Sequence, residues 1–136
     1  MDSNKLLLVE DHNDVREVFR MILTAQGYDV TECPDGKSAV AKANDCLPDI
    51  AIIDIGLPDI NGYQVASQIR QIENSSAKKR SILVALTGRG GVPSRRQSFE
   101  AGFDLYFTKP VELKTVCAEI KAIQIAARDH DKSDAA

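Results

Sequence analysis

The stretch that most constrains the fold of this chain is an apolar run at residues 50–53 that ends in a carboxylate, Asp54. Turn-forming residues follow it at once, namely Gly56, Pro58, Asp59, Asn61 and Gly62. A continuous apolar run of this length, with turn residues behind it, is typical of a strand that is buried on both faces of a parallel sheet. Asp54 then lies at the carboxyl end of the strand, where open α/β sheets bind their ligands. The alternative is that Asp54 only caps a turn, as many aspartates after strands do.

The rest of the chain alternates between strand-like runs and helical patterns. Strands are expected at about residues 6–9, 28–33, 50–54, 82–86 and 104–107, and helices at about 13–26, 37–47, 61–73, 93–101 and 113–127. Five β–α units in this order predict an α/β protein, with a parallel sheet covered by helices on both faces and joined by right-handed crossovers. The fold expected at this size is the flavodoxin-like doubly wound (βα)5 sheet with strand order 2-1-3-4-5. Residues 1–127 are expected to form this one domain, and residues 128–136 a polar C-terminal tail or linker.

The helical patterns also predict which side chains face the core. One face of the first helix holds Val15, Val18, Phe19, Ile22 and Leu23, and one face of the second holds Ala39, Val40, Ala43, Cys46 and Leu47. Asn13 or Asp14 is expected to cap the first helix at its start.

The three cysteines, Cys33, Cys46 and Cys117, are far apart and odd in number. They are therefore interpreted as small buried hydrophobic residues in a reducing compartment, and not as a disulfide framework or a zinc site.

Charge and hydropathy exclude several classes of function. The formal net charge of −3 argues against a general nucleic-acid surface, which would be basic. No apolar run approaches the roughly 20 residues that span a bilayer, and residues 1–5 do not have the layout of a signal peptide. We therefore expect a cytoplasmic domain that contacts neither nucleic acid nor membrane.

The predicted strand order brings polar residues from several strand ends to one edge of the sheet. The first strand is followed by Glu10 and Asp11, and the third, its neighbour, ends in Asp54. Three carboxylates this close repel one another unless a cation lies among them. Because the donors are all hard oxygens, with no histidine or cysteine expected to point in, Mg²⁺ is the ion that suits the site. Thr87 ends the fourth strand and Lys109 follows the fifth, so a hydroxyl and an ammonium group are available to hold a phosphoryl group on Asp54.

These residues, in this order, resemble the receiver domain of two-component response regulators over about residues 5–127. The motifs that carry the resemblance are Glu10-Asp11, Asp54 with Leu57-Pro58 and Asn61-Gly62, Thr87, and Lys109-Pro110. The resemblance implies that Asp54 accepts a phosphoryl group from a phosphohistidine on a histidine kinase or phosphotransfer protein. It also implies a Mg²⁺ ion held by Asp11, Asp54 and the backbone carbonyl of Gly56. Glu10 would act on this ion mainly through coordinated water.

The resemblance further implies roles for the residues around the phosphoryl group. Thr87 and Lys109 would each contact a phosphoryl oxygen, and the peptide bond between Lys109 and Pro110 would be cis. Tyr106 falls on the aromatic switch position, where the ring turns into the space that the Thr87 hydroxyl vacates as it moves toward the phosphoryl group. Phosphorylation then shifts a two-state population and remodels the face formed by the last two helices and the last strand, which controls a downstream protein partner. The alternative for Tyr106 is a plain aromatic residue on an edge strand.

The sequence departs from the commonest receiver pattern at three places. Gly56 leaves no side chain to shield a phosphoryl group, and Gly88 stands where a slightly larger residue is usual. The loop at residues 89–91 is unusually rich in glycine, and Arg89 either reaches the phosphoryl group or is solvated. All three features bear on how long a phosphoryl group persists.

Other functions that a parallel sheet of this kind supports fit the sequence less well. An Asp-nucleophile phosphohydrolase needs a second aspartate as general acid where this chain has Gly56. A flavodoxin-like electron carrier shares the topology, but the acidic loop at residues 10–13 would repel the phosphate of its flavin. His12 is expected to point to solvent, and residues 78–80 to form a solvated basic loop. We therefore expect a signalling module, either a single-domain regulator or a part of a hybrid histidine kinase, that catalyses only its own phosphorylation and dephosphorylation. A phosphorylation-independent docking module with the receiver fold is the alternative.

Overall fold

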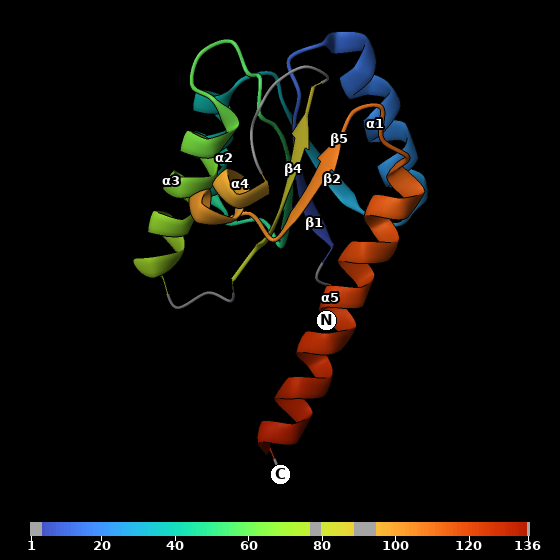
Figure 1. The fold of residues 1–136 in the computed structure, drawn as a ribbon, viewed down its shortest axis with the longest axis vertical. Coiled ribbons are helices and arrows are strands. Elements are labelled where there is room, and N and C mark those ends of the chain that lie inside the picture. The colour runs from blue at the N-terminus through green and yellow to red at the C-terminus, as the bar shows by residue number, and fades with distance from the viewer. Residues whose placement is uncertain (1–3, 77–79, 89–94, 136) are drawn as a thin grey trace.

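The structure, a computed structural model, describes residues 4–76, 80–88 and 95–135. Strands and helices alternate along the chain as β1 Lys5–Val9, α1 Asn13–Ala25, β2 Asp29–Cys33, α2 Gly36–Asp45, β3 Ile50–Asp54, α3 Gly62–Asn74, β4 Ile82–Thr87, α4 Arg95–Ala101, β5 Leu105–Thr108 and α5 Leu113–Ala135. Neighbouring strands pair in parallel, in the order β2-β1-β3-β4-β5 (Figure 1). The flavodoxin-like α/β fold predicted from the sequence is therefore confirmed.

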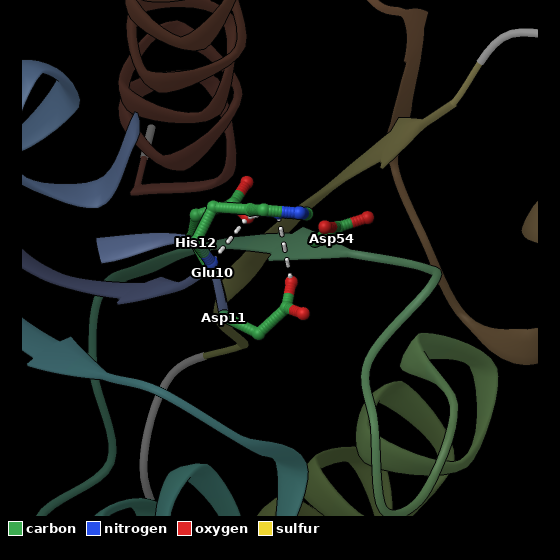
Figure 2. Close-up of side chains that lie close together, drawn as sticks. All are labelled: Glu10, Asp11, His12 and Asp54. Carbon is green, nitrogen blue, oxygen red and sulfur yellow. Dashed lines mark hydrogen bonds and ion pairs between the residues drawn. The ribbon is translucent and has the colours of Figure 1, made fainter. Parts of the chain in front are cut away.

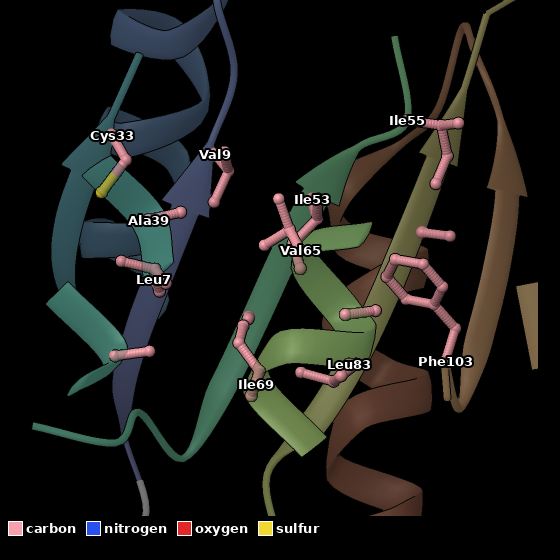
Figure 3. Close-up of a cluster of buried hydrophobic side chains, with 14 of the residues drawn as sticks. Leu7, Val9, Cys33, Ala39, Ile53, Ile55, Val65, Ile69, Leu83 and Phe103 are labelled. Atoms are coloured by element: carbon pink, nitrogen blue, oxygen red, sulfur yellow. The ribbon is translucent and has the colours of Figure 1, made fainter. Parts of the chain in front are cut away.

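Helices cover the sheet on both faces and bury an apolar cluster on each (Figure 1). Leu7 of β1 and Ile53 of β3 belong to the cluster beneath α2 and α3, which Figure 3 shows together with Ile69 of α3. Their neighbours in sequence, Leu8 and Ile52, point the other way, into the cluster beneath α1 and α5. All five residues of β3 are buried, and this is why its sequence is a continuous apolar run rather than an alternating one.

The loop that follows β3 is tied to two helices. The side chain of Asn61 accepts a hydrogen bond from the backbone N–H of Gln64 at 3.0 Å, and the Gln64 side chain accepts one from the Asn61 N–H at 3.0 Å, which caps α3. Asp59 accepts hydrogen bonds from the backbone N–H groups of Gly36 and Lys37, each at 2.9 Å, at the start of α2. Although desolvation opposes them, these N–H groups lower the pKa of Asp59 to about 2. The loop is thereby held at fixed positions on α2 and α3.

A network of charges at the opposite edge of the sheet joins α3 to the starts of β4 and β5. The Arg70 Nη1 donates to both carboxylate oxygens of Glu73, at 2.9 and 3.0 Å, and to the Ser81 carbonyl at 2.8 Å. Its Nη2 donates to Oδ2 of Asp104 at 2.9 Å. The exposed Arg80 contacts the other oxygen of Asp104, Oδ1, also at 2.9 Å. Two arginines thus share one aspartate, but only Arg70 also contacts a buried carboxylate, that of Glu73.

The structure corrects the predicted inner face of α1. Leu23 is buried and Phe19 is half-buried, but Val18 is 52% exposed and Ile22 is 36% exposed. Both Leu23 and Phe19 pack into the cluster beneath α1 and α5. Because these two side chains are four residues apart, they form a narrow contact stripe, and the apolar side chains beside it remain in solvent.

The ends of α1 and α2 also differ from the prediction. α1 begins at Asn13 behind His12, and no side chain caps it, so the predicted cap by Asn13 or Asp14 is wrong. α2 ends at Asp45, which leaves Cys46 exposed at the helix end rather than in the core. The other two cysteines are buried, as predicted.

α5 continues to Ala135, past the expected end near residue 127, because no glycine or proline interrupts residues 128–135. In the described part of the chain, no helix has both the length and the apolar character that crossing a membrane requires. The predictions for Arg89 and the loop around it, for residues 78 and 79 and for a helix start at Pro93 lie outside the described residues.

Candidate functional site

The carboxyl ends of β1 and β3 bring three carboxylates and an imidazole together. β1 and β3 are hydrogen-bonded neighbours, so the residues that follow β1 lie beside Asp54 at the end of β3. Glu10, Asp11, His12 and Asp54 each offer a ligand atom, and these atoms all lie within 4.8 Å of one another (Figure 2). Glu10 and Asp54 are buried, with 1% and 5% of their surface exposed, whereas Asp11 is half-buried and His12 is exposed.

Lys109 provides a positive charge to this cluster. Its Nζ lies 2.8 Å from Oε1 of Glu10 and 3.2 Å from Oδ2 of Asp54. The backbone N–H of Lys109 donates to the Thr87 carbonyl at 2.7 Å, and the Lys109–Pro110 peptide bond is cis. Burial favours the neutral amine, but the two carboxylates outweigh it and raise the pKa of Lys109 above its ordinary value. The side chain is therefore held as a cation between Glu10 and Asp54.

The pKa values of the two buried carboxylates shift in opposite directions. Burial raises the pKa of Asp54, and the charge of Glu10 adds to the effect. The N–H of Gly56, 3.0 Å from Oδ1 of Asp54, and the Lys109 ammonium favour the ionised form without outweighing burial. Burial also opposes ionisation of Glu10, but hydrogen bonds from Lys109 and His12 outweigh it and lower the pKa of Glu10. The surroundings therefore oppose ionisation of Asp54 and favour ionisation of Glu10.

His12 is a member of the cluster that the sequence analysis expected to face only solvent. Its Nδ1 lies 3.1 Å from Oε2 of Glu10 and 3.4 Å from Oδ1 of Asp11, and its backbone N–H donates to the same Glu10 oxygen at 3.1 Å. The ring is nevertheless 71% exposed. The hydrogen bond to Glu10 and the charge of Asp11 raise the pKa of His12. The chain turns directly after Asp11, and this turn, which the sequence pattern does not specify, carries the imidazole back over the carboxylates.

Arg16 is a residue of this site that the sequence analysis did not single out. Its Nη1 donates to the backbone carbonyl of Glu10 at 2.9 Å, and its Nη2 donates to Oδ1 of Asn13 at 2.8 Å. Its Nε lies 3.4 Å from Oε1 of Glu32 on β2. One guanidinium group therefore holds the acidic loop against the neighbouring strand. The only signal in the sequence is a basic residue one turn into α1.

Thr87 and Tyr106 lie together on β4 and β5, at the same edge as Asp54. Leu86 pairs with Asp54 across the sheet, so Thr87, the next residue, extends β4 just past the end of β3. Thr87 is buried, and its hydroxyl donates to the Tyr106 hydroxyl oxygen across 3.5 Å. The ring of Tyr106 packs against the cluster beneath α2 and α3. Thr87 and Tyr106, the two residues predicted to form the switch, are therefore in contact.

The donor atoms around Asp11 fit a small divalent cation. Oδ1 of Asp11 is buried and accepts no hydrogen bond from any residue that the structure describes. A buried carboxylate oxygen without a donor is costly, and a cation would satisfy it. The carboxylate oxygens of Glu10, Asp11 and Asp54 are of the kind that Mg²⁺ prefers. At Gly56, a Cβ atom would lie 3.8 Å from Oδ1 of Asp54, in van der Waals contact, so the glycine places no side chain against this carboxylate.

Comparisons with known proteins point to one family. The family model for the response regulator receiver domain matches residues 6–121. The transcriptional regulatory protein ResD of Bacillus subtilis is 33% identical over 122 residues, which are 90% of this chain and 48% of the relative. The chain therefore spans about half the length of the curated relatives it matches.

Solved structures give the same result. A putative response regulator from Chloroflexus aurantiacus has a TM-score of 0.77 and 30% identity, covering 88% of this chain and 96% of that chain. A chain from the co-crystal structure of the Saccharomyces cerevisiae histidine phosphotransfer signalling protein Ypd1 with the receiver domain of its downstream response regulator Ssk1 has a TM-score of 0.78 and 25% identity, covering 86% of both chains.

Proposed function

The chain belongs to the family of response regulator receiver domains of two-component systems, and on that premise we propose that Asp54 is its phosphoacceptor. The observation that carries the proposal is the setting of this side chain. It is a buried carboxylate at the end of β3, with Oδ1 held by the Gly56 N–H at 3.0 Å and Oδ2 by Lys109 Nζ at 3.2 Å. These two contacts orient the carboxylate, and Gly56 places no side chain between it and an incoming phosphoryl group.

The proposed reaction is transfer from a phosphohistidine to Asp54. A carboxylate oxygen of Asp54 attacks phosphorus, a P–O bond forms, and the P–N bond breaks with its electron pair left on the donor imidazole. The Lys109 ammonium, already beside Asp54, neutralises charge on the phosphoryl oxygens, and the Thr87 hydroxyl is available as a further donor. The domain thereby modifies itself and is not an enzyme for an external substrate.

We assign the metal site to Asp11, Asp54 and the backbone carbonyl of Gly56, with Glu10 acting mainly through water. The buried oxygen Oδ1 of Asp11, which accepts no hydrogen bond from the described residues, supports this assignment. A bound Mg²⁺ ion would supply charge neutralisation for the phosphoryl oxygens. Glu10 has a second role in the ion-free domain. Its Oε1 lies 2.8 Å from Lys109 Nζ and holds that side chain at the site.

Thr87 and Tyr106 are proposed to report phosphorylation to a partner. The Thr87 hydroxyl now donates to the Tyr106 hydroxyl across 3.5 Å, and a phosphoryl group on Asp54 would compete for it. Loss of that contact changes the position of the Tyr106 ring on β5. The surface formed by α4, β5 and α5 would carry this change to a downstream protein in the cytoplasm.

The phosphoryl donor is proposed to dock on α1. Val18, Met21 and Ile22 are exposed and lie three and four residues apart, so they share one face of the helix. An exposed apolar patch of this kind commonly marks a protein interface. α1 begins two residues after Asp11, so a histidine kinase or phosphotransfer protein seated on this patch has its phosphohistidine close to Asp54.

Intact-mass analysis tests the phosphoacceptor. The wild-type domain, Asp54→Asn and Asp59→Asn are each incubated with Mg²⁺ and acetyl phosphate. We expect one added phosphoryl group in the wild type and in Asp59→Asn, which alters an exposed carboxylate of the same loop, and none in Asp54→Asn or with a chelator. If the wild type gains no mass and also binds no beryllofluoride with Mg²⁺, the domain is a phosphorylation-independent docking module.

Donor docking is tested by comparing two phosphoryl sources. Met21→Glu is expected to slow transfer from the cognate phosphohistidine protein about tenfold or more, because it places a charge in an apolar interface. The rate with acetyl phosphate should not change. Ile125→Glu on α5 is the matched control, since Ile125 is equally exposed at 57%. Equal loss in both variants, or loss with acetyl phosphate too, contradicts docking on α1.

A further inference from the structure

The metal site of this chain contains a donor that an oxygen-only Mg²⁺ site lacks. His12 is 71% exposed, and its imidazole lies over the carboxylates of Glu10 and Asp11 and extends toward Asp54 (Figure 2). Imidazole nitrogen is a good ligand for first-row transition metals and a poor one for Mg²⁺, which prefers oxygen. The identity of this residue therefore bears on which ion the site selects.

The hydrogen bond of His12 to Glu10 and its ion pair with Asp11 have lengths that ligands of one ion also have. Two ligands bonded to one metal at about 2.1 Å are roughly 3.0 Å apart at a right angle and roughly 3.4 Å apart at a tetrahedral angle. The Nδ1 of His12 lies 3.1 Å from Oε2 of Glu10 and 3.4 Å from Oδ1 of Asp11. Oδ1 of Asp11 is also the buried oxygen that accepts no hydrogen bond from the described residues. One ion could thus contact the imidazole and this oxygen with little movement of either side chain.

We propose that His12 supplies a nitrogen ligand to this site and shifts its preference from Mg²⁺ toward borderline divalent ions such as Co²⁺ and Zn²⁺. The inference rests on the proposed metal site at Asp11 and Asp54. His12 is the specificity-determining residue, and the carboxylates provide the charge that holds any divalent ion.

In the ion-free domain Nδ1 of His12 donates a hydrogen bond to Oε2 of Glu10 at 3.1 Å, so an ion bound at Nδ1 replaces that proton. The contact of His12 with Glu10 uses Oε2, whereas the contact of Glu10 with Lys109 uses Oε1. Binding of an ion by His12 therefore leaves the Glu10–Lys109 pair intact. The opposite possibility is that the imidazole merely occupies the place of the ion, in which case removing it strengthens the binding of every divalent cation.

Calorimetric titrations with Mg²⁺ and with Co²⁺ distinguish these cases. Outer-shell partners of metal ligands alone account for about 10–100-fold in affinity. We therefore expect His12→Gln to weaken Co²⁺ binding at least about tenfold, and Mg²⁺ binding by less than about twofold. His130→Gln, which removes the other histidine of the chain, should change neither affinity. Asp11→Asn should weaken both ions.

Proton NMR of the Co²⁺ form gives a readout of ligation itself. A hyperfine-shifted, exchangeable imidazole N–H resonance is expected in the wild type and in His130→Gln and is lost in His12→Gln. If this resonance is absent while Co²⁺ still binds, or if His12→Gln binds both ions more tightly, the role of His12 is wrong and the metal site stands. If neither ion binds the wild type, the proposed metal site itself is wrong.

Discussion

The two arginines that share Asp104 allow a sharp test of how this fold is stabilised. Arg70 is 15% exposed at its side chain and also pairs with Glu73, whose side chain is 8% exposed. Arg80 is 63% exposed and has the same 2.9 Å contact with the same aspartate. The perturbation is a pair of matched variants, Arg70→Met and Arg80→Met, which keep most of the aliphatic stem and remove the charge.

The expected magnitudes differ because burial differs. Removing one partner of a buried ion pair costs about 3–5 kcal/mol, since the remaining charge is left buried and uncompensated. In Arg70→Met that charge is Glu73, which among the described residues keeps the hydrogen bond from the Ser81 N–H at 2.6 Å. An exposed pair such as Arg80 with Asp104 contributes about 0–1 kcal/mol. The free energy of unfolding should therefore fall several times further in Arg70→Met than in Arg80→Met.

Urea unfolding followed by far-UV circular dichroism measures the difference. With an m value of about 2 kcal/mol/M, the midpoint should fall by about 2 M in Arg70→Met and by less than about 0.5 M in Arg80→Met. Both variants, while folded, should still be phosphorylated by acetyl phosphate, because Arg70 lies at the edge of the sheet opposite Asp54. Equal midpoint shifts would refute the reasoning, since burial of Glu73 would then not decide the cost.

Three further outcomes follow from the contacts of the site and its loop. The folded-state pKa of Asp59, about 2, lies below the ordinary 3.8, so its contribution to stability is complete above about pH 4 and is lost as the pH falls toward 2. Urea titrations should therefore show a smaller difference in free energy of unfolding between wild type and Asp59→Asn at pH 2.5 than at pH 6. An equal difference at both pH values would contradict this. Gly62→Ala places a Cβ atom 2.8 Å from the Asp54 carbonyl oxygen, so the free energy of unfolding should fall by about 1–3 kcal/mol and phosphorylation should be slower. An unchanged urea midpoint would contradict this steric clash. Lys109→Met removes the ammonium beside Asp54 and Glu10 and should slow phosphorylation by acetyl phosphate about a hundredfold or more, whereas an equal rate would exclude Lys109 from the reaction.

The sequence by itself determined the architecture and the edge at which the site lies. A run such as residues 50–53 is apolar at every position, and only a strand covered on both faces accommodates that pattern. Alternation of such runs with helical patterns then favours a doubly wound sheet, for which 2-1-3-4-5 is the usual strand order at this size. Since parallel strands end at the same edge, Glu10, Asp11 and Asp54 had to meet there.

Only the tertiary structure decided the contacts between segments that are far apart in the sequence and the contacts that depend on the course of a turn. The exposure of Val18 and Ile22 depends on which part of an apolar stripe α1 presents to its neighbours, and helical periodicity alone does not contain that information. The contact of Arg70 with Asp104 joins residues 34 positions apart. The place of His12 depends on the turn after β1. Periodicity records local backbone geometry, whereas a polar contact between segments depends on positions to within a few tenths of an ångström, which only packing of the whole chain sets.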